Sequence, residues 1–257
     1  MERPPEQIVA QWLFEADSAV AFTGAGASTE SGIPDFRSPG GVWTKYRTVY
    51  FDEFLASAEA RHEYWRQKCE AHRAFAEAEP NAGHRALARW ESLGRLAGVI
   101  TQNIDGLHQR AGSRLVLELH GTALEIGCLD CRARYDAGPM VEQFLARQAV
   151  PECLACGSSL MKHATISFGQ ALAPDVLQTA YAWAKRSRLF LAIGSSLVVE
   201  PAASLPRRAK EYGARLVIIN RDPTPQDALA DLVIRRPIGE TLTEIDRELQ
   251  ALEAAFD

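Results

Sequence analysis

Residues 18–29 read SAVAFTGAGAST, an apolar run that leads into a glycine-rich turn. The run from Ser18 to Phe22 is typical of a buried strand in a parallel sheet. Gly24 and Gly26 permit a tight bend, and the free amides at the start of a following helix can bind a pyrophosphate. This order of strand, turn and helix predicts a dinucleotide-binding βα unit.

The glycine pattern alone is weak evidence for a nucleotide site. Thr29 occupies the place of the third glycine in GxGxxG, and no acidic residue clearly closes a second strand to bind a ribose. A βα turn with glycines for steric reasons explains these residues about as well. The pattern therefore gives little support to a hydride-transferring Rossmann enzyme.

Further short runs rich in Val, Ile and Leu predict more strands of the same sheet. Several alternate with segments of helical length, such as residues 174–186 and 201–212. This alternation predicts a largely parallel sheet covered by helices on both faces. The predicted strands are residues 98–101, 115–119, 189–193, 215–219 and 232–234.

Four of the five cysteines form two CxxC pairs, with 21 residues between the pairs. Each pair can offer two thiolates to one tetrahedral Zn²⁺, and a site with four cysteines leaves no position for substrate. We therefore expect a structural zinc, bound by Cys128, Cys131, Cys153 and Cys156. A redox role explains two pairs in one short segment less well. Cys69 is expected to be a plain buried thiol.

Two stretches interrupt the alternation of strands and helices, residues 51–79 and the segment within 123–164 that holds the paired cysteines. Residues 51–79 are rich in Ala, Glu, Arg and His without a strand signal, which predicts a helical insertion. The predicted fold class is α/β, a Rossmann-like doubly wound parallel sheet with a small zinc-binding and helical domain. We expect the large domain to comprise residues 1–50, 80–122 and 165–257, and the small one 51–79 and 123–164.

The composition excludes several functional classes. The chain has 257 residues and a net charge of −5, with acids and bases interspersed, so it offers no basic stripe to a nucleic acid. It has neither a secretory signal nor a run of about 18 apolar residues. We expect a cytoplasmic protein without direct nucleic-acid or membrane binding. A monomer is expected, although the sequence carries no signal for the oligomeric state.

The segment from residue 32 to residue 41, GIPDFRSPGG, places an acid, an aromatic ring and a guanidinium together in a loop. Such a loop can fold over a bound ligand and exclude water. A surface loop with a solvated Asp–Arg pair is the alternative, and composition alone favours it. The three side chains are Asp35, Phe36 and Arg37.

Polar side chains follow several predicted strands. Ligands of parallel α/β sheets bind at the carboxyl ends of the strands, where such groups can orient ribose hydroxyls. A helix cap explains Asp105 well but Gln102 and Asn103 less well. Two later strands end in similar polar residues: Gly194, Ser195 and Ser196, and then Asn220, Arg221 and Asp222.

His120 also lies at a predicted strand end, directly before Gly121. The ordinary pKa of histidine suits proton transfer near neutral pH. Because a lone histidine is more often structural, the polar groups at the neighbouring strand ends are what favour a catalytic role.

These segments together resemble the sirtuins, a family of NAD-dependent protein lysine deacylases. The resemblance implies that NAD and an acyl-lysine peptide meet in a cleft between two domains. The acyl oxygen attacks the nicotinamide ribose, which releases nicotinamide and forms an alkylimidate. His120 then acts as general base on a ribose hydroxyl, and lysine and O-acyl-ADP-ribose are the products. The matching segments are GAGASTESGIPDFRS, TQNIDGLHQRAG, ELHG, the CxxC pairs, GSSLVVEPAA and the stretch at Asn220.

The same resemblance implies a role for each motif residue. The catalytic residues would be His120, Asn103 and Asp105. The diphosphate would be held by Gly24, Ala25, Gly26 and Ser28, below a mobile loop of Asp35, Phe36 and Arg37. The remaining NAD contacts would be Gln102, Ile104, Gly194, Ser195, Ser196, Asn220, Arg221, Asp222 and Ile238. The peptide would add as a strand between Val198-Val199 and Phe168-Gly169.

The chain departs from the sirtuin pattern in the loop that faces the substrate. The usual Phe-Gly-Glu is Phe168-Gly169-Gln170, and the proline expected before it is replaced around Lys162-His163. These changes affect peptide and acyl preference rather than NAD binding. The stretch from Tyr64 to Lys68 lacks the Tyr-x-x-Arg pair of desuccinylating members, so we expect uncharged acyl groups, acetyl first.

Other functions would use the same pocket. An NAD glycohydrolase or ADP-ribosyltransferase would cleave the same glycosidic bond, but the substrate loops around Val198 and Phe168 favour deacylation. A non-catalytic NAD sensor or zinc-ribbon interaction module would not need a base such as His120.

Overall fold

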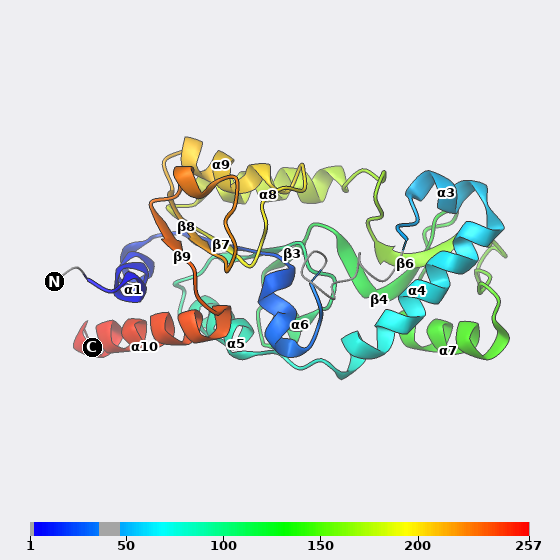
Figure 1. The fold of residues 1–257 in the computed structure, drawn as a ribbon, viewed down its shortest axis with the longest axis horizontal. Helices are drawn as coiled ribbons and strands as arrows, with labels where there is room; N and C mark the ends of the chain where they lie inside the picture. The colour runs from blue at the N-terminus through cyan, green and yellow to red at the C-terminus, as the bar shows by residue number, and fades with distance from the viewer. Residues whose placement is uncertain (1–2, 36–46, 257) are drawn as a thin grey trace.

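The computed structural model describes residues 3–35 and 47–256 and places two sheets toward opposite ends of an elongated molecule (Figure 1). The larger sheet has six strands, all parallel, in the order β3-β2-β1-β7-β8-β9. The strands are β1 (Ala19–Thr23), β2 (Gly98–Thr101), β3 (Val116–Glu118), β7 (Leu189–Ile193), β8 (Arg215–Ile219) and β9 (Leu232–Ile234). The doubly wound parallel sheet predicted from the sequence is confirmed.

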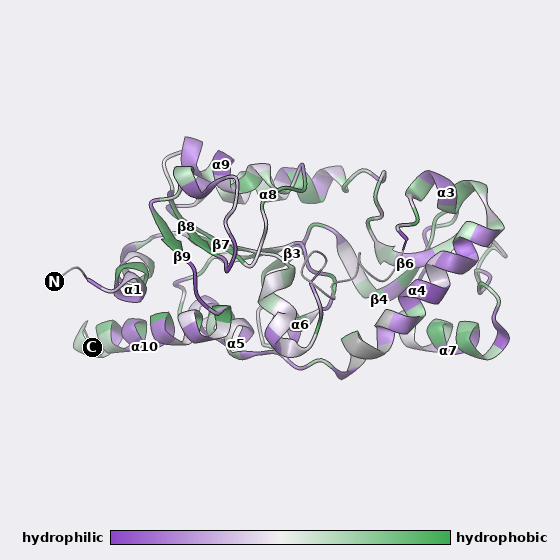
Figure 2. Ribbon diagram, viewed as in Figure 1, coloured by the Kyte–Doolittle hydropathy of each residue, from purple (hydrophilic) through white to green (hydrophobic). Residues whose placement is uncertain are grey.

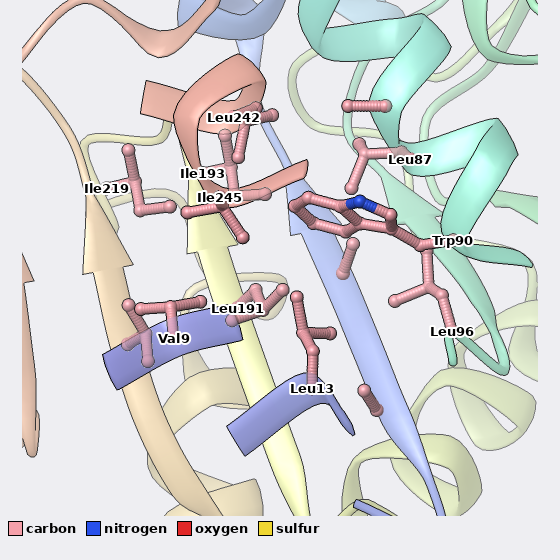
Figure 3. Packing of buried hydrophobic residues seen from close by; sticks show 14 of the residues in the cluster. Val9, Leu13, Leu87, Trp90, Leu96, Leu191, Ile193, Ile219, Leu242 and Ile245 are labelled. Atoms are coloured by element: carbon pink, nitrogen blue, oxygen red, sulfur yellow. The ribbon is translucent and has the colours of Figure 1, made fainter. Parts of the chain in front are cut away.

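Helices cover both faces of this sheet. One layer consists of α1 (Pro5–Glu15), α5 (Ala82–Ser92) and α10 (Ile238–Phe256), and the other of α8 (Pro174–Arg186) and α9 (Ser204–Glu211). The strands are apolar along their length because both of their faces are buried, as the hydrophobic colour of β7 and β8 shows (Figure 2). Trp90 and Leu191 are buried in the first of the two cores (Figure 3).

The strand order creates a switch point between β1 and β7. Counted along the chain, the strands of the large sheet lie in the order 3-2-1-4-5-6. Strands β2 and β3 lie on one side of β1, and β7, β8 and β9 lie on the other. A crevice for ligands opens at the carboxyl ends of strands at such a point.

The second sheet is antiparallel and belongs to a separate core. It has the order β5-β4-β6 and consists of β4 (Gly121–Cys128), β5 (Arg134–Asp136) and β6 (Met161–Thr165). Three helices pack with it, α3 (Phe51–Ala56), α4 (Ala58–Glu77) and α7 (Ala137–Arg147). Trp65 fixes α4 to this sheet, because its ring stacks on Phe144 and its Nε1 donates to the carbonyl of Met161 at 2.7 Å.

The structure refines three expectations from the sequence. The insertion at 51–79 is helical as predicted, whereas the antiparallel sheet around the cysteines was not predicted. The glycine turn leads into a 3-10 helix, η1 (Ala25–Ser31), in which the Thr29 hydroxyl donates to the Gly26 carbonyl at 2.9 Å. Helix α9 begins at Ser204 rather than 201, which places Pro206 in its first turn, where a missing N–H is tolerated.

Two smaller helices complete the description: α6 (Leu107–Arg110), which follows β2, and the 3-10 helix η2 (Asp227–Leu229). None of the helices in the described ranges combines the length and the apolar character that a membrane span needs.

Truncating a core side chain tests the packing of the large domain. Leu191 in the middle of β7 is fully buried, so Leu191→Ala should lower the free energy of unfolding by about 3 kcal/mol. Leu115→Ala, at a residue that is 54% exposed, is the control and should change it by less than about 1 kcal/mol. Urea unfolding would measure both, and equal losses would contradict the packing described above.

Candidate functional site

The predicted site residues lie at one edge of the large sheet. Gly24 follows β1, Gln102 follows β2, His120 lies two residues after β3, Gly194 follows β7 and Asn220 follows β8. Because these strands are parallel, their carboxyl ends meet at the same edge. The structure therefore brings together residues that are nearly 200 positions apart in the sequence.

Three glycines allow the backbones after β1 and β7 to touch. The Gly26 amide donates to the Gly194 carbonyl at 2.9 Å, and the Gly24 amide donates to the Ile193 carbonyl at 3.0 Å. A Cβ on Gly24 or Gly26 would lie 2.8 Å from Gly194, and a Cβ on Gly194, whose φ is +63°, would lie 2.5 Å from the Ala27 nitrogen. Only glycine fits this contact, which keeps side chains out of the crevice.

Ser28 is the centre of a buried polar network. The Ser28 hydroxyl donates to Asp105 Oδ2 at 2.7 Å and accepts from Asn103 Nδ2 at 3.0 Å. The Asn103 amide also donates to the Gly24 carbonyl, and Asp105 Oδ1 accepts from the Leu107 amide at 2.9 Å. Asp105 thus orients Ser28 and also accepts from the first amide of α6, whose N-cap is Gly106.

The geometry of His120 fixes its tautomer. Its Nδ1 lies 3.0 Å from the Gln102 carbonyl, and a carbonyl oxygen can only accept. The neutral imidazole therefore carries its proton on Nδ1 and presents a free lone pair on Nε2. Burial lowers the pKa of His120 from its ordinary value of 6.5, although the bond to Gln102 opposes this shift. His120 is consequently neutral at pH 7 and can accept a proton.

The side chain of Gln102 reaches across the switch point. Its Nε2 donates to Ser195 Oγ at 2.8 Å, which ties the end of β2 to the loop after β7. Ser195 is buried, Ser196 and Ile104 are half-buried, and the Ile104 carbonyl accepts from the Ala123 amide at 2.9 Å. His120 itself lies in the chain between β3 of the large sheet and β4 of the small one.

The residues predicted for the adenosine side lie beyond β8. Asn220 Nδ2 donates to the Asp222 carbonyl at 2.7 Å, and Arg221 pairs with the Asp222 carboxylate at 2.8 Å. Ile238, at the start of α10, approaches Gly194 closely enough that its Cδ1 would lie 2.9 Å from a Cβ there. Asp35 is half-buried, whereas Phe36 and Arg37 lie outside the described residues.

The residues predicted to bind the peptide lie at the surface. Phe168 is 42% exposed and Val198 is 49% exposed, and Gly169 is exposed as well, while Val199 is half-buried. The Phe168 carbonyl accepts from the Phe51 amide at 2.9 Å, which docks the start of α3 on this turn. Exposed apolar side chains at the surface are suited to contact with a peptide.

A buried network next to the site was not anticipated from the sequence. The Thr23 hydroxyl donates to Thr101 Oγ1 at 2.8 Å and lies 2.9 Å from His108 Nε2. The His108 ring meets His84 edge-on at 4.8 Å, and burial lowers the pKa of His108 to about 3. These residues come from four segments of the chain, so no local pattern could have revealed their contact.

The four paired cysteines form one cluster. Their sulfur atoms all lie within 4.8 Å of one another, with Cys128 and Cys156 at 3.6 Å and Cys131 and Cys153 at 3.5 Å. Four sulfurs around a tetrahedral zinc with bonds of about 2.3 Å are about 3.8 Å apart. The cluster therefore fits the predicted zinc. The four cysteines would occupy all four positions of the tetrahedral ion and leave none for a substrate.

Metal analysis tests the cysteine cluster. The purified protein should hold one zinc per chain, and Cys131→Ser should lose most of it and melt at a lower temperature, because a three-thiolate site binds more weakly. Cys69→Ser, at the fifth cysteine, is the matched control and should retain the metal. Full zinc content in Cys131→Ser would contradict the assignment.

Comparisons with known proteins give a consistent result. Residues 24–201 match the model of the Sir2 family. An NAD-dependent protein deacetylase of Rhodopseudomonas palustris is 52% identical over 90% of this chain and 91% of its own length. An NAD-dependent protein deacylase 2 of Archaeoglobus fulgidus is 43% identical over 95% of this chain and 96% of its own.

Solved structures extend the likeness to the fold. A Sir2 complex with a p53 peptide and NAD⁺ is 36% identical with a TM-score of 0.87, and the match covers 97% of this chain and all of that one. A Sir2 variant with a deacetylated p53 peptide and 3′-O-acetyl-ADP-ribose gives a TM-score of 0.88 at 38% identity, over 94% and 97%. Family match, identity and fold agree, and the chain belongs to the Sir2 family.

Proposed function

We propose that this protein is an NAD-dependent protein lysine deacylase, with acetyl-lysine as its first substrate. The observation that carries the proposal is His120, a neutral imidazole whose Nε2 is free to accept a proton at the edge of the nucleotide crevice. The related deacetylases and deacylases, and the peptide and NAD complexes among Sir2 structures, support it.

NAD is the co-substrate in this proposal. Gly24, Ala25, Gly26 and Ser28, at the start of η1, would hold the diphosphate, as the sirtuin resemblance implies. Gln102, Asn103, Ile104 and Asp105 would face the nicotinamide ribose. The adenosine half would contact Gly194, Ser195, Ser196, Asn220, Arg221, Asp222 and Ile238.

Two of the proposed catalytic residues, Asn103 and Asp105, are held in place by hydrogen bonds. Asn103 and Asp105 are buried and bound to Ser28, so their proposed part in catalysis is to fix the shape of the nicotinamide end. Asp35 with Phe36 and Arg37 would close over the co-substrate, and this assignment rests on the sirtuin resemblance.

The proposed reaction converts acyl-lysine, NAD and water to lysine, nicotinamide and O-acyl-ADP-ribose. The acyl oxygen forms a bond to the ribose carbon as the bond to nicotinamide breaks. His120 Nε2 then takes the proton of a ribose hydroxyl, which lets that oxygen attack the acyl carbon. The bond from this carbon to the lysine nitrogen then breaks, the amine leaves with a proton, and water adds to the carbon, so that the acyl group remains on one ribose oxygen. The Gln102 carbonyl supports this step, because it holds Nδ1–H and stabilises the imidazolium that forms.

The acyl peptide would bind between Phe168-Gly169 and Val198-Val199. The first segment follows β6 and the second follows β7, and each presents one exposed apolar side chain, Phe168 and Val198. An NAD glycohydrolase has no use for such a surface, so the deacylase is the better supported function.

The remaining proposals concern organisation and location. Residues 51–79 and 123–164 would form the small domain and the rest the NAD-binding domain, which is supported by the separate core around Trp65 and Phe144. Unpaired cysteines suited to zinc support a reducing compartment, and we propose the cytoplasm. The partners would be acyl-lysine proteins, not nucleic acids, with the enzyme acting as a monomer.

Removing the base tests the proposed reaction. His120→Ala should lower kcat by about 10² to 10⁴-fold, because no other side chain replaces Nε2. Mass spectrometry of a reaction with NAD and an acetyl-lysine peptide should find O-acetyl-ADP-ribose and free lysine together in the wild type. His62→Ala, at an α4 histidine that bonds the Gln148 carbonyl, is the control and should remain active. NAD consumption without peptide deacylation would favour the glycohydrolase.

The rate should depend on pH through His120. The base works only when neutral, and its pKa is lowered below 6.5 by burial, so activity is lost as pH falls through a value below 6.5. We expect kcat/KM for the peptide to be level near neutral pH and to fall on the acidic side with a midpoint under 6.5. A profile over about pH 5 to 8 would measure it. A midpoint clearly above 6.5 would argue against His120 as the base.

A further inference from the structure

Lys162 on β6 is a buried ammonium without a carboxylate partner in the described part of the chain. It is 2% exposed, and its Nζ donates to three oxygens: the carbonyls of His163 and Thr165, and Gln170 Oε1 at 3.4 Å. Burial, with the positive charges of Lys68 and Arg134, lowers its pKa to about 7. A lysine this deeply buried is costly, so its contacts require an explanation.

Gln170 connects this lysine to the turn of residues 167–170. Gln170 Oε1 accepts from Lys162 Nζ and from the Ser167 amide, the latter at 3.1 Å. The backbone amide of Gln170 donates to the backbone carbonyl of Ser167 at 3.0 Å, and this hydrogen bond closes the turn. Gly169, with a φ of +83°, provides the left-handed residue that such a turn needs.

The turn follows directly on a residue that is bonded to His120. The Ile166 amide donates to the His120 carbonyl at 2.8 Å, so the segment begins directly beside the site. The two departures from the sirtuin pattern, around Lys162-His163 and at Gln170, are in contact with each other. They therefore act as a pair rather than as separate substitutions.

We propose that Lys162 and Gln170 form a clamp that holds the Phe168-Gly169 turn in the conformation that receives the acyl peptide. The clamp sets the affinity for the peptide and leaves the affinity for NAD unchanged, because it touches neither the glycine turn nor the strand ends that face the nucleotide. Lys162 and Gln170 are positioning residues in this scheme. The inference rests on the proposed function, in which this turn binds the peptide.

The chemistry of the pair explains the choice of residues. An ammonium has three donors and fills all three acceptors, while a glutamine oxygen accepts from two donors without adding a charge. The ring of Tyr64 also lies against the ammonium, with its centroid 5.6 Å from Nζ, and the Tyr64 hydroxyl lies 3.4 Å from Thr165 Oγ1.

The test compares Gln170→Leu with Gln143→Leu, a half-buried glutamine on α7 of the same core. Gln170→Leu removes the acceptor, so amide exchange of the segment 163–171 should become faster in the free protein. The Kd of an acetyl-lysine peptide should rise about 5-fold or more, with the KM for NAD changed less than about 2-fold. Gln143→Leu should change none of these quantities.

Two further variants separate a clamp from a loss of packing. Gln170→Glu keeps an acceptor oxygen, so its exchange rate and its peptide Kd should equal those of the wild type. Lys162→Met removes the donor and should behave like Gln170→Leu. Unchanged exchange in Gln170→Leu would overturn the clamp, and this readout does not depend on catalysis. Faster exchange with an unchanged peptide Kd would also overturn the proposal. Absence of deacylation by the wild type would instead contradict the proposed function.

Discussion

The contact between the backbones after β1 and β7 is the constraint on which the rest of the site depends. Gly26 and Gly194 approach until the amide of one donates to the carbonyl of the other at 2.9 Å, which is possible only without Cβ atoms. Their approach places the 3-10 helix η1 over the switch point. Without it, η1 and the polar residues at the carboxyl ends of the strands would not lie together at the switch point.

Several elements then fasten η1 in this position. The Gly239 amide at the start of α10 donates to Glu30 at 2.8 Å, and Asn81, which caps α5, donates to the Ala27 carbonyl at 2.8 Å. Ser28 adds the bonds to the loop after β2. A short helix of small residues has little stability of its own, so these partners supply the rigidity that a diphosphate site requires.

The features that could be predicted from the sequence are the local ones. Each strand of the large sheet is a compact apolar run, and the CxxC spacing identifies metal ligands directly, so both were found. The Thr23–His108 contact and the pairing of β4 with β6 join segments far apart in the chain, whereas Lys162 and Gln170 are close in the chain and meet because the turn at 167–170 folds back. Their residues carry no periodicity or spacing, because the fold alone brings them together.

His120 is tied to both sheets of the molecule. Its ring bonds the Gln102 carbonyl at the end of β2, and its own carbonyl accepts from the Ile166 amide beyond β6. The large sheet therefore fixes the orientation of the imidazole, while the antiparallel sheet holds the adjacent backbone. Because His120 is tied to both sheets, its position is fixed relative to each of them. In the proposed reaction, these two attachments would fix the position of the imidazole relative to both the nucleotide and the peptide.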